Sequence, residues 1–386
     1  MNVNRQLYID NLRLLVIALV VLQHIAVTYS GFGDWYYIES GEIGIVQTII
    51  FGFHQAFTQG YFMGLLFLIA GYFTPNSYDK KGFGLFIKDR FIRLGIPVFI
   101  YVLAIHPILG LGILGYRFGA DGFIANGGGG ILASYVEYFV GFHFIGGTGP
   151  LWFALALLIF SMLYAVIRKC VARKSLTSNT CFPKFTNILA LILLISVCAF
   201  IIRIVQPIGT NVYNMQLGFF SQYIFLFIVG IYCKRNDWLE KLDYATGRLW
   251  LIWGISLGFV LFVGIMIFGG ALDGRISLFD GGLTWQSAAY ALWESFIAIS
   301  MAIGLIALFK ERFNKQNEFV KRLSKNAFSV FVFHSLIIVS LSLLFAPVNL
   351  IPIIKFVIVS IVGIPLCFLI TDITIQRIPF LRKLFV

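Results

Sequence analysis

Residues 8–29, YIDNLRLLVIALVVLQHIAVTY, form one apolar run that is long enough to cross a membrane as an α-helix. Two polar residues, Arg13 and His24, stand inside this run. At about 100° and 1.5 Å per residue, a helix places them on one face, about 16 Å apart along its axis. Asp10 falls near the same stripe, just before Arg13. Because a charge inside a membrane span is costly unless it is paired or hydrated, this stripe predicts a functional site.

The composition of the whole chain is that of a membrane protein. Of its 386 residues, 59% are hydrophobic, and the mean hydropathy is +0.91. A soluble domain could not keep that much apolar surface out of water. The apolar runs have the length of helices rather than of alternating barrel strands, so we predict an all-α, polytopic membrane helical bundle. Residues 1–386 are predicted to form a single integral-membrane domain without a cleavable signal peptide.

The apolar runs predict about ten transmembrane helices. A further stretch, residues 131–145, is too short and too polar for a span, and we expect a short interfacial or re-entrant segment there. The five cysteines fall in spans or in loops of one side with no metal-ligand spacing, so neither disulfides nor a metal site is expected. The predicted spans cover residues 8–30, 45–74, 94–115, 150–168, 186–206, 217–233, 249–270, 286–310, 327–346 and 352–373.

The distribution of basic residues predicts the orientation of these spans. Ten spans place both termini and four loops on the same side, and that side holds 24 of the 29 lysines and arginines. Because short cytoplasmic loops are enriched in basic residues, we predict that this side, with both termini, is cytoplasmic. The formal net charge of +12 reflects this bias, and a nucleic-acid partner is not needed to explain it.

A second basic cluster is predicted at the start of the third span. Arg90 and Arg93, three residues apart in LFIKDRFIRLGIPVF, share a helix face and can fork around phosphate oxygens. The alternative is that they only anchor the span by the positive-inside rule, with Asp89 as a local partner. The sequence leaves both interpretations open.

Several other polar or aromatic residues have a structural and a functional interpretation. His334 stands alone among apolar neighbours, where a histidine is more often a hydrogen-bonded core residue than a ligand-binding group. Trp152, after a Gly-Pro pair, fits an aromatic belt, and the small Gly71 beside Tyr72 fits close helix packing. Arg203 is expected to snorkel to the interface. Three further histidines are expected to be peripheral: His54, His106 and His143.

Taken together, several motifs resemble the acyltransferase-3 family of bacterial integral-membrane acyltransferases, over nearly the whole chain. The LWF form is similar to the glucan-succinylating and other stand-alone members. One departure is that many relatives carry a glutamate just after this tripeptide, whereas this chain has Ala154, Leu155 and Ala156. The motifs are Arg13-x10-His24, FMGLLFLIAGYF at 62–73, the F-x3-R-x2-R-L run from Phe86 to Leu94, GPLWF at 149–153, AFSVFVFH ending at His334, and IPFLRKLF at 378–385.

The resemblance implies a membrane O-acyltransferase of the bacterial cytoplasmic membrane. It implies an acyl-CoA donor, acetyl-CoA by default and succinyl-CoA as an option, and a hydroxyl acceptor on an extracytoplasmic or exported glycan. His24 is then the catalytic imidazole, as a general base or as an acyl carrier, and Asp10 orients the cation beside it. The remaining roles are CoA binding by Arg13, Arg90 and Arg93, and substrate binding by Trp152, His334 and Tyr72.

Two other functions use the same residues differently. A transporter or exporter of a polysaccharide or lipid-linked sugar would use the buried polar groups as a pathway, but inverted repeats with broken helices are not evident. A non-catalytic membrane sensor on the same scaffold is the second alternative, suggested by the missing glutamate. We expect membrane lipids around the bundle, no metal and no nucleic acid, and the sequence leaves the oligomeric state open.

Overall fold

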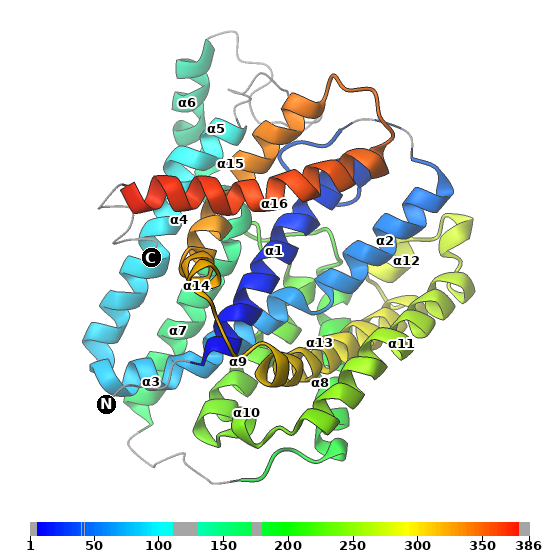
Figure 1. Ribbon diagram of the computed structural model, residues 1–386. Helices are drawn as coiled ribbons and strands as arrows, with labels where there is room; N and C mark the ends of the chain where they lie inside the picture. Colours follow the sequence, from blue (N-terminus) through cyan, green and yellow to red (C-terminus); the bar gives the residue numbers. More distant parts are fainter. Residues whose placement is uncertain (1–5, 40, 42, 111–129, 172–179, 378–386) are drawn as a thin grey trace.

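The computed structural model describes residues 6–39, 41, 43–110, 130–171 and 180–377, and these form a helical bundle (Figure 1). Within them the only extended pairing is an isolated bridge between Val212 and Met215, which confirms the predicted all-α class. The longer helices are α1 (Leu7–Ser30), α2 (Ile45–Gln59), α3 (Phe62–Arg90), α6 (Gly130–Val140), α7 (Trp152–Cys170), α8 (Phe185–Val205), α9 (Phe220–Arg235), α11 (Tyr244–Phe268), α13 (Trp285–Arg312), α14 (Glu318–Lys325), α15 (Ala327–Phe345) and α16 (Pro352–Arg377).

In the described part of the chain, nine helical stretches are long and apolar enough to cross a membrane. One of them, Ile45–Gly110, has 66 residues and contains both the second and the third predicted spans. Gly82 interrupts it, because its φ of 71° and ψ of 174° are not helical. The ribbon folds back at the lower left of Figure 1, between the labels α3 and α4. The stretch therefore accounts for two of the predicted spans.

The predicted span 45–74 is not one continuous helix, because the chain breaks between α2 and α3 at Gly60 and Tyr61. A helix break inside a membrane frees backbone groups that need new partners. Here the Gln222 side chain from α9 donates to the Gly60 carbonyl at 2.9 Å, and Gln59 donates to the Tyr223 hydroxyl at 3.1 Å. Polar side chains of a distant helix thus stabilise a break that the local sequence did not reveal.

The stretch after Gly82 contains two π-helical turns, η1 (Phe91–Gly95) and η2 (Tyr101–Ile105), and each precedes a proline. Proline lacks an N–H group and its ring crowds the carbonyl four residues earlier, so a wider turn relieves the contact. Around Pro107, the backbone carbonyls of residues 102 and 103 lose their usual hydrogen-bond partner within the helix. The Tyr138 hydroxyl donates to Val102 at 2.9 Å, and the Tyr135 hydroxyl donates to Leu103.

Those two tyrosines come from the stretch 131–145, which forms α6 and a short turn η3 (His143–Gly146). It is too short to appear among the candidate spans, as predicted. The freed carbonyls near Pro107 give a physical reason for the packing of α6 against η2. Its location at the membrane interface stays a prediction.

Hydrogen bonds gather most of the basic loops at one end of the bundle, which we call the basic end. At the start of α1, the Tyr8 backbone N–H donates to the Asn314 side chain at 3.2 Å. Lys310 donates to backbone carbonyls of the 239–242 turn at 2.7–3.1 Å. Arg235 forms a fork with Asp79, at 2.6 and 3.2 Å. The basic loops that set the predicted orientation therefore lie together.

The other end, which we call the opposite end, collects the loops between the remaining helix termini. Lys355 of α16 donates to Glu39 at 2.6 Å, and the Asn214 side chain donates to the Gly149 carbonyl at 2.8 Å. The loop 31–39 is therefore anchored to α16. The two sets of loops therefore lie at different ends of the bundle, and the predicted even number of crossings stays a prediction.

Glycines permit the close packing of α3 against α9. A Cβ atom added at Gly71 would lie 2.1 Å from the Phe227 carbonyl oxygen, and one at Gly230 would lie 2.1 Å from that of Leu68. Backbones approach this closely only when side chains are absent. The structural interpretation of Gly71 is confirmed.

Arg203 does not snorkel, contrary to the expectation from its place near the end of a span. Its side chain is fully buried and pairs with Glu294 of α13, which is equally buried. Its Nε also donates to the Gly218 carbonyl at 3.1 Å. Because a carboxylate and a carbonyl are available inside the bundle, the guanidinium is paired there through Nη2 and Nε and need not reach the interface. Its Nη1 has no hydrogen-bond partner among the described residues.

Candidate active site

His24 lies on α1, most of the way from the basic end to the opposite end. Its ring stacks on Trp35, with centroids 3.8 Å apart and planes at 12°. The contact forms because α1 ends at Gly31, whose φ of 71° lets the chain turn back. The Glu39 N–H then donates to the Thr28 carbonyl at 2.9 Å, which holds the loop against the helix. Trp35 thus covers one face of the imidazole.

His334, from α15, lies beside His24. Their ring centroids are 5.1 Å apart with planes at 22°, and the centroids of His334 and Trp35 are 6.0 Å apart. If His334 covered the face of His24 opposite Trp35, the three rings would form one stack. The distance from the His334 centroid to the Trp35 centroid would then be close to 3.8 Å plus 5.1 Å, rather than the observed 6.0 Å. The shorter value places His334 near the edge of the imidazole, so the face opposite Trp35 is not stacked by either ring.

Each of these three rings carries a buried polar atom with no hydrogen-bond partner among the described residues: His24 Nδ1, Trp35 Nε1 and His334 Nε2. Buried polar groups of folded proteins are nearly always paired, and exceptions gather at functional sites. Three such atoms on three contacting rings make this cluster a candidate site for a polar ligand.

A hydrogen-bonded network extends from this cluster toward α5 (His106–Gly110). His106 Nδ1 lies 2.7 Å from the Tyr36 hydroxyl, and Tyr101 connects Tyr36, at 3.0 Å, to the Ser335 hydroxyl, at 2.9 Å. His106 is 8% exposed, so the expectation that it is peripheral is wrong. No local sequence pattern predicts this network, because its members come from segments far apart in the chain.

The GPLWF motif packs directly against this network. A Cβ atom added at Gly149 would lie 2.2 Å from the Tyr36 hydroxyl oxygen and 2.8 Å from that of Tyr101. Gly149 also has a φ of 47°, in the left-handed region that side chains disfavour. The motif therefore begins with glycine because the two tyrosines and the backbone leave no room for a side chain.

Trp152 and the positions after it face a different part of the core. The Trp152 ring stacks on Tyr223 at 5.6 Å, and no ring contact among the described residues joins it to His24. Ala154 and Ala156, where relatives carry the glutamate, are buried. The structure thus places Trp152 near the α9 aromatic residues and apart from the paired histidines.

Arg13, Asp10 and Tyr72 lie at the basic end. Arg13 Nη1 is 3.6 Å from Asp10 Oδ1, and its guanidinium lies 5.8 Å from the centre of the Phe73 ring. Asp10 is about 21 Å along α1 from His24, so it contacts the cation and not the imidazole. Tyr72 accepts a hydrogen bond from Gln6 at 2.9 Å, which places it with Arg13 rather than with His24.

The two arginines of the third span differ in their surroundings. Arg93 is 65% exposed and its Nε donates to Asp89 at 3.1 Å, whereas the guanidinium of Arg90 lies over Phe86, 5.0 Å from the ring centre. Arg90 Nε is buried with no hydrogen-bond partner among the described residues. No described contact connects either arginine to Arg13, so phosphate binding and membrane anchoring both remain open.

Comparison with known proteins decides the family. The sequence matches the acyltransferase domain family over residues 6–372, which is nearly the full chain. The chain belongs to the acyltransferase-3 family. It is therefore an enzyme that transfers acyl groups, and its nine apolar helical stretches make it a multi-pass membrane acyltransferase. No curated protein and no solved structure matches the sequence.

Three basic residues of this acyltransferase make contacts that the sequence did not indicate. The Lys234 ammonium lies 5.4 Å from the centre of the Tyr72 ring, close to the residues around Arg13. Asp79 holds Arg235 and also lies 3.7 Å from Arg168. In the sequence these cations contributed only to the charge bias, because their partners lie on other helices.

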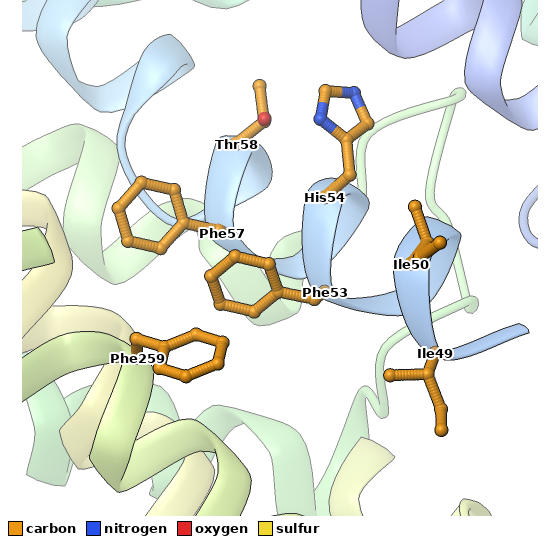
Figure 2. Close-up of a pocket in the computed structure, with 7 residues that line it drawn as sticks. All are labelled: Ile49, Ile50, Phe53, His54, Phe57, Thr58 and Phe259. Atoms are coloured by element: carbon orange, nitrogen blue, oxygen red, sulfur yellow. The ribbon is translucent and has the colours of Figure 1, made fainter. Parts of the chain in front are cut away.

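The acyltransferase also has a groove between α2 and α11, with a volume of about 330 Å³. Figure 2 shows Phe53 and Phe57 of α2 near Phe259 of α11, with the imidazole of His54 pointing away from Phe259. The walls are mostly apolar, as lipid-facing grooves are. The groove does not include His24 or its neighbours, so it is separate from the reacting groups.

Proposed function

We propose that this acyltransferase moves an acyl group from acyl-CoA, bound at the basic end, to a hydroxyl group of an extracytoplasmic or exported glycan at the opposite end. The observation that carries the proposal is the division of α1. One end holds Arg13 among cations, and His24 lies about 16 Å further along, beside unpartnered buried polar atoms. Pantetheine is a long, thin arm that suits this separation.

At the basic end, Arg13 would bind a phosphate or the amide arm of CoA, with Asp10 orienting its guanidinium. The ion pair between them and the half-exposed side chain of Arg13 support this role. Arg90 and Arg93 would contribute further phosphate contacts from η1 and the end of α3. Tyr72, held by Gln6, would line the entrance for the donor.

At the cluster of histidines, His24 would act on the thioester. A neutral imidazole there takes the proton of the attacking hydroxyl, or it carries the acyl group as a covalent intermediate. The lone pair of an imidazole lies in the ring plane, so the acyl carbon would approach His24 at an edge of the ring, where Nδ1 is unpartnered among the described residues. Tyr36 and Trp152, both at the opposite end, would stack on sugar rings of the acceptor.

The default acyl group is acetyl, with succinyl as the alternative, and no metal takes part in the proposal. The cell membrane is proposed to be the bacterial cytoplasmic membrane, with the basic end and both termini on the cytoplasmic side. The gathering of basic loops at one end supports this orientation.

The test is transfer by the purified protein in lipid nanodiscs, with labelled acetyl-CoA or succinyl-CoA as donor and gluco-oligosaccharides as acceptor. We expect His24→Ala to abolish transfer and to leave CoA affinity and thermal stability close to native, because the imidazole acts at the reacting atoms. Mass spectrometry of surface glycans from cells with and without the protein gives the acyl mass and the acceptor. A stable His24→Ala protein with the native transfer rate would refute the proposal.

A further inference from the structure

The hydrogen bond of His334 identifies which of its nitrogen atoms carries the proton. His334 Nδ1 lies 2.8 Å from the backbone carbonyl oxygen of Phe331. A carbonyl oxygen only accepts hydrogen bonds, so Nδ1 must donate and must carry the proton. In the neutral ring, Nε2 then presents a lone pair.

This lone pair lies in the cluster of unpartnered atoms. His334 is fully buried, and its Nε2 has no hydrogen-bond partner among the described residues. His24 is its neighbour, at a ring separation of 5.1 Å, and His24 Nδ1 is likewise unpartnered. The two rings are in contact at this separation. An acceptor hydroxyl would therefore lie beside both imidazoles and donate its proton to His334 Nε2.

The position of His334 is fixed from two sides. The Phe331 carbonyl orients its ring, and the next residue, Ser335, is hydrogen-bonded to Tyr101 at 2.9 Å. Where an imidazole activates a hydroxyl nucleophile, one ring nitrogen takes the proton and the other donates a hydrogen bond to an acceptor that orients the ring. His334 has this arrangement, because Nδ1 donates to the Phe331 carbonyl and Nε2 is unpartnered among the described residues. This explains why a histidine on an otherwise apolar face is needed at position 334.

We infer that His334 is a second catalytic residue and the base that accepts the proton of the acceptor hydroxyl. The inference rests on the proposed function. The hydroxyl oxygen forms a bond to the acyl carbon while its proton moves to Nε2. This assignment leaves His24 as the acyl carrier: one of its nitrogens has already bonded to the acyl carbon, and CoA has left as the thiol with the proton of that imidazole. The bond from the acyl carbon to the His24 nitrogen now breaks. The His24 nitrogen takes the proton from His334, so this step yields the ester and restores both imidazoles.

The experiment compares two acceptors in His334→Asn. The Asn amide nitrogen can occupy the place of Nδ1 and keep a donor toward the Phe331 carbonyl, whereas no basic nitrogen remains. Gluco-oligosaccharides need a base, because their hydroxyl must lose a proton. Hydroxylamine attacks a thioester through a lone pair that needs no proton removal, so it reports on the donor and on His24 alone. The rate measured without protein is subtracted.

We expect His334→Asn to lower the rate of transfer to the sugar by about 10²–10⁴-fold and to leave transfer to hydroxylamine nearly unchanged. His24→Ala should lose both reactions. The matched control is His54→Asn, which replaces histidine by asparagine in the apolar groove on α2. This variant should keep transfer to the sugar and transfer to hydroxylamine.

Three results would overturn the inference. Native sugar transfer by His334→Asn would show that no base acts at this position. Equal loss with both acceptors would assign His334 to the fold or to the donor, and the proposed function would still stand. If the native protein transfers acyl groups to neither acceptor, the proposed function fails, and the assignment of His334 fails with it.

Discussion

At the scale of single residues, the candidate site divides into a cation, Arg13, that is proposed to hold the donor, and two imidazoles, His24 and His334, that are proposed to react. Arg13 and His24 could be recognised from the sequence, because their types and spacing are unusual inside an apolar run. Trp35 and His106 could not be assigned, because their roles depend on contacts with segments far away in the chain. Trp35 reaches His24 only because Gly31 reverses the chain.

This division predicts different defects for the two positions on α1. We expect Arg13→Ala to weaken CoA binding by about tenfold or more, since an ion pair with phosphate is lost, and Arg13→Lys to weaken it less. Calorimetric titration with CoA and with dephospho-CoA measures the effect. The control is His24→Ala, which should bind CoA like the native protein. Equal affinity of native protein and Arg13→Ala would place the donor phosphates elsewhere.

At the scale of elements, the apolar runs were sufficient to predict most helices. The break between α2 and α3 escaped prediction, because its stabilising partner is Gln222 on α9. The π-turns escaped it too, although the prolines at 97 and 107 were visible. A proline indicates that a helix must adjust, but the neighbours that satisfy the freed carbonyls decide how.

The close packing of Gly149, the first residue of the GPLWF motif, can be tested by adding a single methyl group at that position. We expect Gly149→Ala to destabilise the protein by roughly 1–3 kcal/mol and to lower acyl transfer, because the new Cβ would meet the hydroxyls of Tyr36 and Tyr101. Gly146→Ala is the matched control, since no atom lies within 4 Å of its added Cβ. Thermal unfolding in detergent and the transfer assay measure both. Equal behaviour of the two variants would refute the packing argument.

At the scale of the whole molecule, the charge bias anticipated that the basic loops lie at one end. The buried ion pair between α8 and α13 was not anticipated, because Arg203 and Glu294 are 91 residues apart. Nothing in the local sequence indicates that they meet. Long-range pairing of polar groups in an apolar bundle becomes visible only in three dimensions.

Replacing only one member of the Arg203–Glu294 pair should destabilise the bundle more than replacing both. We expect Arg203→Leu or Glu294→Leu to cost about 3–5 kcal/mol, because each leaves a buried charge without its partner. The double variant should recover much of that loss. Thermal unfolding of the four proteins in the same detergent forms a double-mutant cycle. Additive losses would mean that the two side chains do not act as a pair.

The orientation can be tested with single cysteines in a cysteine-free background. We expect Asn314→Cys, at the basic end, to react with a membrane-impermeant maleimide only after the cells are opened. Gly146→Cys, beyond α6, should react in intact cells. Labelling of both positions from the same side would refute the odd number of crossings predicted between them.

The Arg203–Glu294 pair also constrains how this protein can change over generations. Replacing either residue alone passes through a variant with an isolated charge in an apolar interior, which selection would remove. The two positions should therefore be inherited as a unit, and related chains should carry both charges or neither. A lineage that exchanges them for apolar residues needs both substitutions almost at once, so α8 and α13 should evolve together even though neither helix carries His24 or His334.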